Sequence, residues 1–294
     1  MAINTVSSWR ELDDAISEIS RPKSQRHAHS TVVFRGLART DYSHVSSLAR
    51  LRGDYPSLER HLLRNFRKYA HRRAPGPTMW DWLALGQHHG LPTRLLDWTF
   101  SPLVALHFAT ASWRHDDALL LAVDCERTHD LLPGPLHGVL EREGALLFTT
   151  EMLAEEAPTL AQFDRCARED PFLAFFEPPS LDERIVNQSA VLSALSDPTC
   201  HMEDWLENHP DLWRAWRIPA AIKADIRQRL DQSNVTERVL FPGLDGLAAW
   251  LRRYYSPDDV DRGEPDESGG AAMDGGGESR GQQEGSMSGS PGGG

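Results

Sequence analysis

The sequence predicts an α+β fold, a single mixed domain in which helices interrupt the strands. Two observations indicate this class. Apolar or β-branched runs typical of strands occur at 31–34, 118–123, 172–176 and 190–195, and capped or amphipathic helical segments lie between and around them. The run at 118–123 is almost entirely apolar, as expected for a strand covered on both faces of a sheet.

The first elements follow in chain order. Ser8 caps a short helix that places Leu12, Ile16 and Ile19 on one side. The strand at 31–34 carries Arg35 at its exit. A basic amphipathic helix is then expected at 57–71. Its predicted inward residues are Leu58, Leu62, Leu63, Phe66 and Tyr69, and its outward residues are Arg60, Arg64, Arg67, Lys68 and Arg72.

The later helices begin and end at capping and breaking residues. A helix at 78–89, with Trp80 and Trp82 expected in the core, is stopped by Gly90 and Pro92. Ser101-Pro102 is an N-cap followed by proline in the first turn, and it opens a helix over 103–113. Further helices are expected at 219–230 and 244–254.

The composition excludes several classes of protein. The chain of 294 residues is 40% hydrophobic and 25% charged, which is ordinary for a globular protein. No run approaches 18 uncharged apolar residues, so neither a spanning helix nor a membrane partner is expected, and the first twenty residues lack a secretory-signal pattern. Cys125, Cys166 and Cys200 lie far apart without metal-ligand spacing, which favours a cytoplasmic protein without disulfides or a cysteine metal site.

The net charge of −12 is unevenly distributed. Residues 256–294 hold nine acids against Arg262 and Arg280, a charge of −7, which leaves about −5 for the rest of the chain. The same segment holds 12 of the 22 glycines. We expect a disordered Gly/Ser/acidic tail at 256–294, preceded by a helical lead-in at 1–29 and a main domain at 30–255.

Polar residues crowd into residues 86–102, a stretch expected to form a loop between helices. It contains His88, His89, Arg94, Asp97 and several hydroxyls, which must satisfy one another or face a ligand. Arg94 and Asp97 are expected to pair across a tight turn. Arg35 is expected either to pair with Asp97 or Glu183 or to bind phosphate. HExxH, GxSxG, Walker and GxGxxG motifs are absent from the sequence, which argues against several large enzyme classes.

These residues resemble the FRG domain, a family named for a Phe-Arg-Gly motif. The motif stands here as Phe34-Arg35-Gly36, and the resemblance continues through the block from Gln87 to Thr99 and the helix 101–109. It reappears at 184–189 and at 240–246, so that it covers roughly residues 30–255. One departure is that Ser189 follows Gln188 where the family usually has Gly.

The order of these motifs is similar to that of the ADP-ribosyltransferase superfamily. That resemblance implies a core with a central split β-sheet flanked by helices, and NAD as the substrate. It implies that Arg35 contacts NAD, that Thr99 and Ser101 form a hydroxyl patch, and that Gln188 occupies the catalytic position. From the residues themselves we add His89 and Glu183 as candidate catalytic residues beside Arg35 and Gln188, and Gly36, His88, Thr93, Arg94 and Asp97 as candidate NAD-binding residues beside Arg35, Thr99 and Ser101. Gln188 stands where the superfamily has a glutamate, so the acid could instead be Glu183 or Asp97.

Three functions follow for testing. The first is an NAD-consuming ADP-ribosyltransferase or NAD glycohydrolase, acting as a toxin or phage-defence effector on a protein or nucleic-acid acceptor, with an antitoxin or defence-system partner. The second is a non-catalytic nucleotide or nucleic-acid binding module, favoured by the neutral Gln188 and by the basic face of 57–72. The third, ranked last, is a metal-dependent hydrolase using His88, His89 and Asp97. Our leading expectation assigns no residue as a metal ligand.

Overall fold

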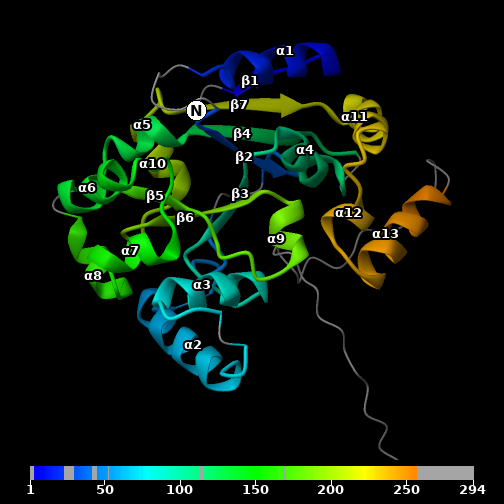
Figure 1. Cartoon of the computed structure of the whole chain (residues 1–294). Coiled ribbons are helices and arrows are strands. Elements are labelled where there is room, and N and C mark those ends of the chain that lie inside the picture. The colour runs from blue at the N-terminus through cyan, green and yellow to red at the C-terminus, as the bar shows by residue number, and fades with distance from the viewer. Residues whose placement is uncertain are drawn as a thin grey trace, which may run out of the picture.

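A computed structural model describes residues 3–22, 30–41, 45–51, 53–73, 75–112, 115–167 and 170–256. Within these ranges, seven strands form one sheet in the order β1-β7-β4-β2-β3-β6-β5 (Figure 1). The strands are β1 (Ile3–Thr5), β2 (Val32–Leu37), β3 (Leu96–Thr99), β4 (Ala118–Asp124), β5 (Leu173–Phe176), β6 (Ala190–Leu195) and β7 (Trp213–Ile218). β1 runs parallel to β7, and the other neighbouring strands are antiparallel. The mixed fold class is confirmed.

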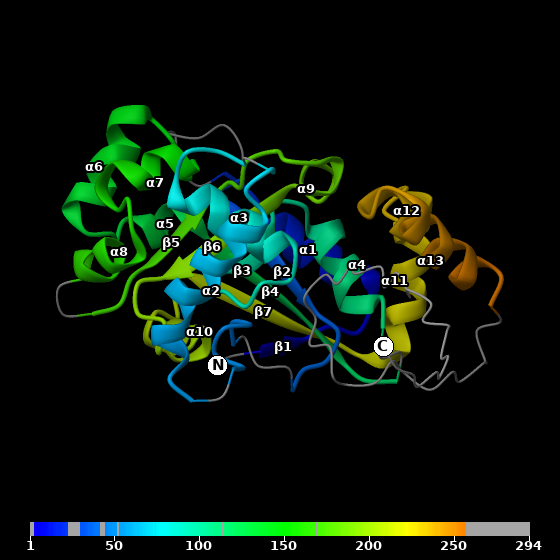
Figure 2. The same ribbon diagram turned by 90° about the horizontal axis from the view of Figure 1, so that it is seen from below.

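Helices flank this sheet. They are α1 (Trp9–Ile19), α2 (Tyr55–Tyr69), α3 (Met79–His88), α4 (Pro102–Thr110), α5 (Cys125–His129), α6 (Gly134–Glu143), α7 (Thr150–Glu156), α8 (Leu160–Cys166), α9 (Glu183–Asn187), α10 (Met202–Asn208), α11 (Ala220–Gln232), α12 (Glu237–Leu240) and α13 (Leu244–Tyr254). Helices α6, α7 and α8 lie at one end of the molecule, and α12 and α13 lie at the other (Figures 1 and 2).

Alternation along the strands divides the apolar side chains between the two faces of the sheet. Phe34 and Leu120 pack with α1, α4 and α11 on one face, whereas Val33 and Leu121 pack with α10 on the opposite face. A further cluster centred on Trp80 joins α3 with α6, α7 and α8 over β5 and β6. Trp80, Trp82 and Trp98 are all buried, which confirms the core assignment of the first two.

The sheet is narrowest between β2 and β3. These strands are joined by one registered pair, Phe34 with Thr99, whereas β3 and β6 pair along four residues. The expected central split is not observed, because β2 and β3 remain paired and the described strands form one continuous sheet. Residues 86–102, the polar stretch of the sequence, lie beside this narrow joint between β2 and β3.

Several element boundaries agree with the sequence. β4 is buried throughout, as predicted for a strand covered on both faces. Thr78 forms a capping box with Asp81 at the start of α3, and the side chain of Ser101 accepts a hydrogen bond from the backbone N–H of Val104 at the start of α4. The lead-in differs from the prediction, because residues 3–5 form a strand that adds to β7.

Three local predictions are wrong. Residues 86–102 are not a loop throughout, because Leu96–Thr99 pair with β6 as strand β3. Arg35 lies within β2 rather than at its exit, because pairing with β4 continues to Leu37. On α2, Leu58 and Tyr69 are 39% and 79% exposed, because the inward stripe is centred on Glu59 and Leu63.

None of the described helices is both long and apolar enough to cross a membrane. The tail predicted at 256–294 lies, apart from Ser256, outside the described residues.

Candidate functional site

A cleft opens between α3 and α9, over β3 and β6. The cleft is shallow and open: the empty space between its lining residues, counted together with the solvent at its mouth, is about 450 Å³. Its lining consists of Ala84, Gln87, His88, Asp97, Pro178, Arg184, Ile185, Gln188, Ala190 and Leu192. Of the residues predicted for the site, His88, Asp97 and Gln188 are thus brought together.

The carboxylate of Asp97 is held from one side by a chain of hydrogen bonds. Gln87 donates from Nε2 to Oδ2 of Asp97 at 2.8 Å. The hydroxyl of Thr93 donates to Oε1 of Gln87 at 2.5 Å and accepts from the backbone N–H of Leu95 at 3.1 Å. Thr93 is fully buried and outside the cleft lining, so its hydroxyl fixes the orientation of the Gln87 amide.

Gln188 caps the C-terminal end of α9 and is held equally firmly. Its side-chain Nε2 donates to the carbonyl of Leu240 at 2.9 Å, and its own carbonyl accepts from the hydroxyl of Thr99 at 2.6 Å. Thr99 in turn accepts from the backbone N–H of Ser101 at 3.0 Å. The hydroxyls of Thr99 and Ser101 are therefore engaged in fixing β3, α4 and α9, and they do not line the cleft.

His88 connects the two walls of the cleft. Its Nε2 lies 2.5 Å from Oδ2 of Asp182, the residue that caps α9 through Oδ1 and the backbone N–H of Ile185. His89 is exposed and does not line the cleft, and its ring lies 5.3 Å from that of His88. Desolvation lowers the pKa of His89, and the positive charges of His88 and Arg73 act in the same direction.

Arg184 is the cationic residue of the cleft, and the sequence analysis did not assign it a role. It lies in the first turn of α9, with its guanidinium carbon 5.0 Å from the centre of the Phe241 ring. In the sequence, the segment 184–189 is distinguished only by its resemblance to the family. Its one arginine, close to Gln188, is the signal that could have identified Arg184 as a site residue.

Arg35 lies at the joint of the sheet rather than in the cleft lining. It donates from Nη1 to the backbone carbonyl of Asp97 at 2.5 Å, while its Nε is buried without a hydrogen-bond partner among the described residues. Burial lowers the pKa of Arg35, and the Asp97 carboxylate opposes this shift. Gly36 serves packing, because a Cβ there would lie 1.8 Å from the carbonyl oxygen of Ala105 in α4.

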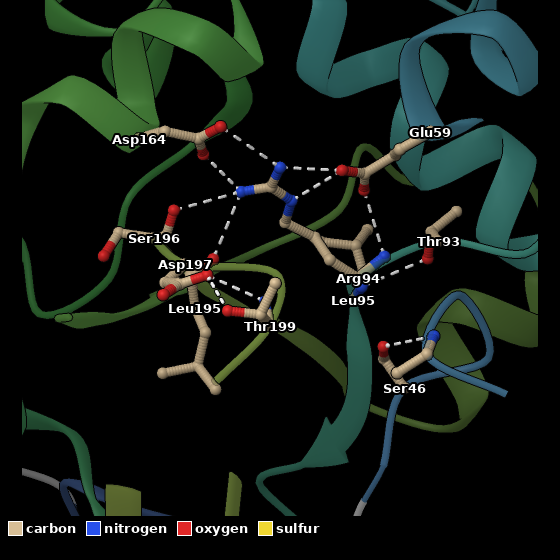
Figure 3. A network of polar contacts seen from close by, with 11 residues as sticks. Ser46, Glu59, Thr93, Arg94, Leu95, Asp164, Leu195, Ser196, Asp197 and Thr199 are labelled. Atoms are coloured by element: carbon tan, nitrogen blue, oxygen red, sulfur yellow. Dashed lines mark hydrogen bonds and ion pairs between the residues drawn. The ribbon is translucent and has the colours of Figure 1, made fainter. Parts of the chain in front are cut away.

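Arg94 is the centre of a separate buried network (Figure 3). Its guanidinium lies 2.7 Å from Glu59 and 2.5 Å from Asp164, and its backbone N–H also donates to Glu59 at 3.1 Å. The predicted pair of Arg94 with Asp97 is wrong. The tight turn expected between Arg94 and Asp97 does not form, because β3 begins at Leu96. Asp97 follows the alternation of side chains along this strand, whereas Arg94 precedes it. Arg94 joins α2 and α8 to the strand instead.

Glu183 is exposed on α9 and does not line the cleft. Asp97 is therefore the acidic residue among those that line the cleft. Over the described ranges, no group of three or more His, Cys, Asp or Glu side chains is arranged to hold a metal ion.

Comparison with known proteins gives one match. Residues 30–118 match the family model of the FRG domain. This stretch contains Phe34-Arg35-Gly36 and the whole block that includes Asp97, but the segments 184–189 and 240–246 lie beyond it. No curated protein and no solved structure matches the chain.

Proposed function

We propose that this chain, which carries an FRG domain at residues 30–118, binds NAD in the cleft between α3 and α9 and cleaves its N-glycosidic bond. The observation that carries the proposal is the Asp97 carboxylate. It lies half-buried in the cleft, with Oδ2 held by Gln87 and with no hydrogen bond to Oδ1 from any described residue.

The proposed reaction needs a negative charge at one place. As the bond between ribose C1′ and the nicotinamide nitrogen breaks, its electron pair leaves with nicotinamide and positive charge develops on the ribose. A fixed carboxylate stabilises that charge, and water or an acceptor nucleophile then forms the new bond to C1′ and releases a proton. Transfer to water gives ADP-ribose, and transfer to an acceptor gives an ADP-ribosylated product.

Asp97 suits this role better than the two residues considered beside it. Gln188 is neutral, and its amide is already donating to the carbonyl of Leu240. Glu183 is exposed and outside the cleft lining. A charge held in advance by Gln87 and Thr93 needs little reorganisation when the ribosyl cation forms.

Arg184 provides the complementary charge for the phosphates of the substrate. A guanidinium is planar and always charged, which suits it to phosphate oxygens. The distribution of one cation and one carboxylate within a single cleft fits a ligand that is anionic at its phosphates and becomes cationic at its ribose. NAD is such a ligand.

Because loss of NAD harms a cell, we propose that the protein acts as a toxin or phage-defence effector and that an antitoxin or defence-system partner restrains it. The alternative is a binding module that does not turn NAD over, and it rests on the neutral Gln188. The experiment below distinguishes an enzyme from a binding module.

The test is nicotinamide release from NAD by the purified full chain, compared with Asp97→Asn. We expect release by the wild type and a loss of roughly 10²–10³ in rate in the variant, the effect of removing one preorganised charge. Glu183→Gln is the matched control, because it removes a carboxylate of α9 outside the cleft lining, and it should keep the wild-type rate.

Two results would count against the proposal. Equal rates for Asp97→Asn and the wild type would remove Asp97 from the chemistry. NAD binding by the folded wild type without nicotinamide release, with or without candidate acceptors, would favour the binding module.

A further inference from the structure

An exposed cationic face runs along α2 and into the turn that follows it. We call it the α2 basic face and define it by Arg60, Arg64, Arg67, Lys68, Arg72 and Arg73. All six side chains are exposed. Spacings of three and four residues place those on the helix along one side. The face carries a formal charge of +6 on a chain whose net charge is −12.

The α2 basic face is not neutralised locally. Between residues 55 and 73, Glu59 is the one acidic residue in the sequence, and it is buried against Arg94. Within the described part of the chain, no acidic side chain forms an ion pair with the six cations. Basic side chains on a solvated helix are normally interspersed with acids, so an unmixed face on an acidic protein indicates a polyanionic partner.

An aromatic side chain stands beside one of these charges. Tyr69 is 79% exposed, and the ammonium group of Lys68 lies 5.6 Å from the centre of its ring. Large exposed aromatic rings beside cations are the feature on which unpaired bases stack, whereas acidic peptides need the cations alone.

The α2 basic face also leads to the cleft. Helix α3 lies between α2 and α9 in both views of the molecule (Figures 1 and 2). Arg67 lies over the Trp82 ring of α3, at 5.3 Å from its centre. At the end of the face, Arg73 is close enough to His89 to act on its charge, and His89 is adjacent to the cleft residue His88.

We propose that the α2 basic face binds single-stranded nucleic acid, with the arginines and Lys68 on the phosphates and Tyr69 stacked on a base. If the proposed NAD chemistry holds, a strand on this face would lie beside the cleft, where its bases or its terminus could act as the acceptor. The binding itself does not depend on that chemistry.

The test measures fluorescence anisotropy of a labelled 20-nucleotide single strand, as DNA and as RNA, with the full chain and no NAD. We compare the wild type with Arg60→Glu/Arg64→Glu/Lys68→Glu. We expect saturable binding by the wild type. The triple variant should lose most of it, with a smaller slope of log K against log salt, since each phosphate contact contributes about 0.7 to that slope.

The matched control is Arg10→Glu/Arg229→Glu/Arg252→Glu, which makes the same change in net charge at exposed residues of α1, α11 and α13, away from α2 (Figure 1). It should bind within about threefold of the wild type, because charge distant from the site is screened at physiological salt. Tyr69→Ala should weaken binding by about tenfold, the effect of losing one stacked base. Circular dichroism checks that each variant is folded.

The proposal is overturned by any of three results: no binding by the wild type at physiological salt, equal loss in the control triple variant, or displacement of the oligonucleotide by poly-glutamate as effectively as by unlabelled oligonucleotide. The last result would identify a site for acidic proteins instead. Because the assay contains no NAD, its outcome is independent of nicotinamide release.

Discussion

Arg35 and Asp97 meet across the narrowest point of the sheet, where the guanidinium of Arg35 donates to the backbone carbonyl of Asp97 at 2.5 Å. Beyond the single registered pair of β2 and β3, this bond ties the strand that carries the FRG arginine to the strand that carries the cleft carboxylate. Arg35 is thereby a positioning residue for Asp97. Its Nε, buried and without a hydrogen-bond partner among the described residues, leaves a donor available at the same joint.

Replacing Arg35 by Met should loosen the joint and displace Asp97. We expect the free energy of unfolding to fall by about 2 kcal/mol, the effect of losing a hydrogen bond from a charged donor. Nicotinamide release should fall on the order of tenfold to a hundredfold. Arg10→Met, which removes an exposed cation of α1, is the control. Full activity in Arg35→Met would remove Arg35 from the site.

The network of Arg94 should be important for stability rather than for chemistry. Arg94→Met leaves Glu59, which is 2% exposed, as an uncompensated buried charge, and about 3–5 kcal/mol of stability should be lost in urea denaturation. Adding Glu59→Leu should recover part of that loss because the unpaired charge is removed. A single variant that loses less than about 1 kcal/mol would show that the pair is not the anchor of α2.

Two buried histidines predict a loss of stability in mild acid. Burial lowers the pKa values of His107 and His129 to about 4 in the folded chain. Unfolded histidine titrates near 6.5, so protons bind the unfolded chain first as the pH falls. The contribution to stability is therefore complete above the unfolded pKa and is lost between about pH 6.5 and 4.

The size of this effect follows from the two pKa values. Each histidine should cost about 2 kcal/mol of unfolding free energy between pH 7 and pH 5. His129 accepts from the backbone N–H of Phe175 and lies 2.9 Å from the carbonyl of Leu146, so His129→Gln can keep both contacts. That variant should show a smaller pH dependence than the wild type measured beside it. An unchanged dependence in His129→Gln would contradict the assignment.

Gly36 should tolerate no side chain. A Cβ at this position would lie within 3 Å of the backbone of Ala105 and Ala109, so Gly36→Ala must push α4 away from β2. We expect a loss of about 3 kcal/mol or more, the upper range for overpacking. Gly138→Ala in α6 meets nothing within 4 Å and should be neutral or stabilising. A well-folded Gly36→Ala with unchanged melting temperature would contradict the close approach.

Local signals in the sequence were sufficient for much of the fold. Thr78 and Gly90 bound α3, and the unbroken apolar run of β4 indicated a central strand. β7 was missed because its six residues show neither an unbroken apolar run nor strict alternation, since the exposed Arg214 and Arg217 lie three residues apart. β1 was missed because its three residues are exposed and are held by pairing with β7 alone.

The site was harder to predict, because its contacts are distant in the sequence. Glu59 reads as one charge on a basic helix until Arg94, 35 residues later, is placed against it. Arg184 and Gln188 reach the cleft only because α9 folds over β3 and β6. The block from Gln87 to Asp97 could be identified as polar and crowded. That Asp97 pairs with Gln87 rather than with Arg94 depends on distant residues, because Arg94 is held by Glu59 and Asp164.

The role of Asp97 can be tested by chemical rescue of nicotinamide release in Asp97→Gly. We expect this variant to be inactive and added formate to raise its rate at least about tenfold, since a free carboxylate can stabilise the same developing charge. Formate should leave the wild type and Glu183→Gln unchanged. Wild-type activity that survives in Asp97→Gly without formate would contradict the account, as would a folded wild type that releases no nicotinamide.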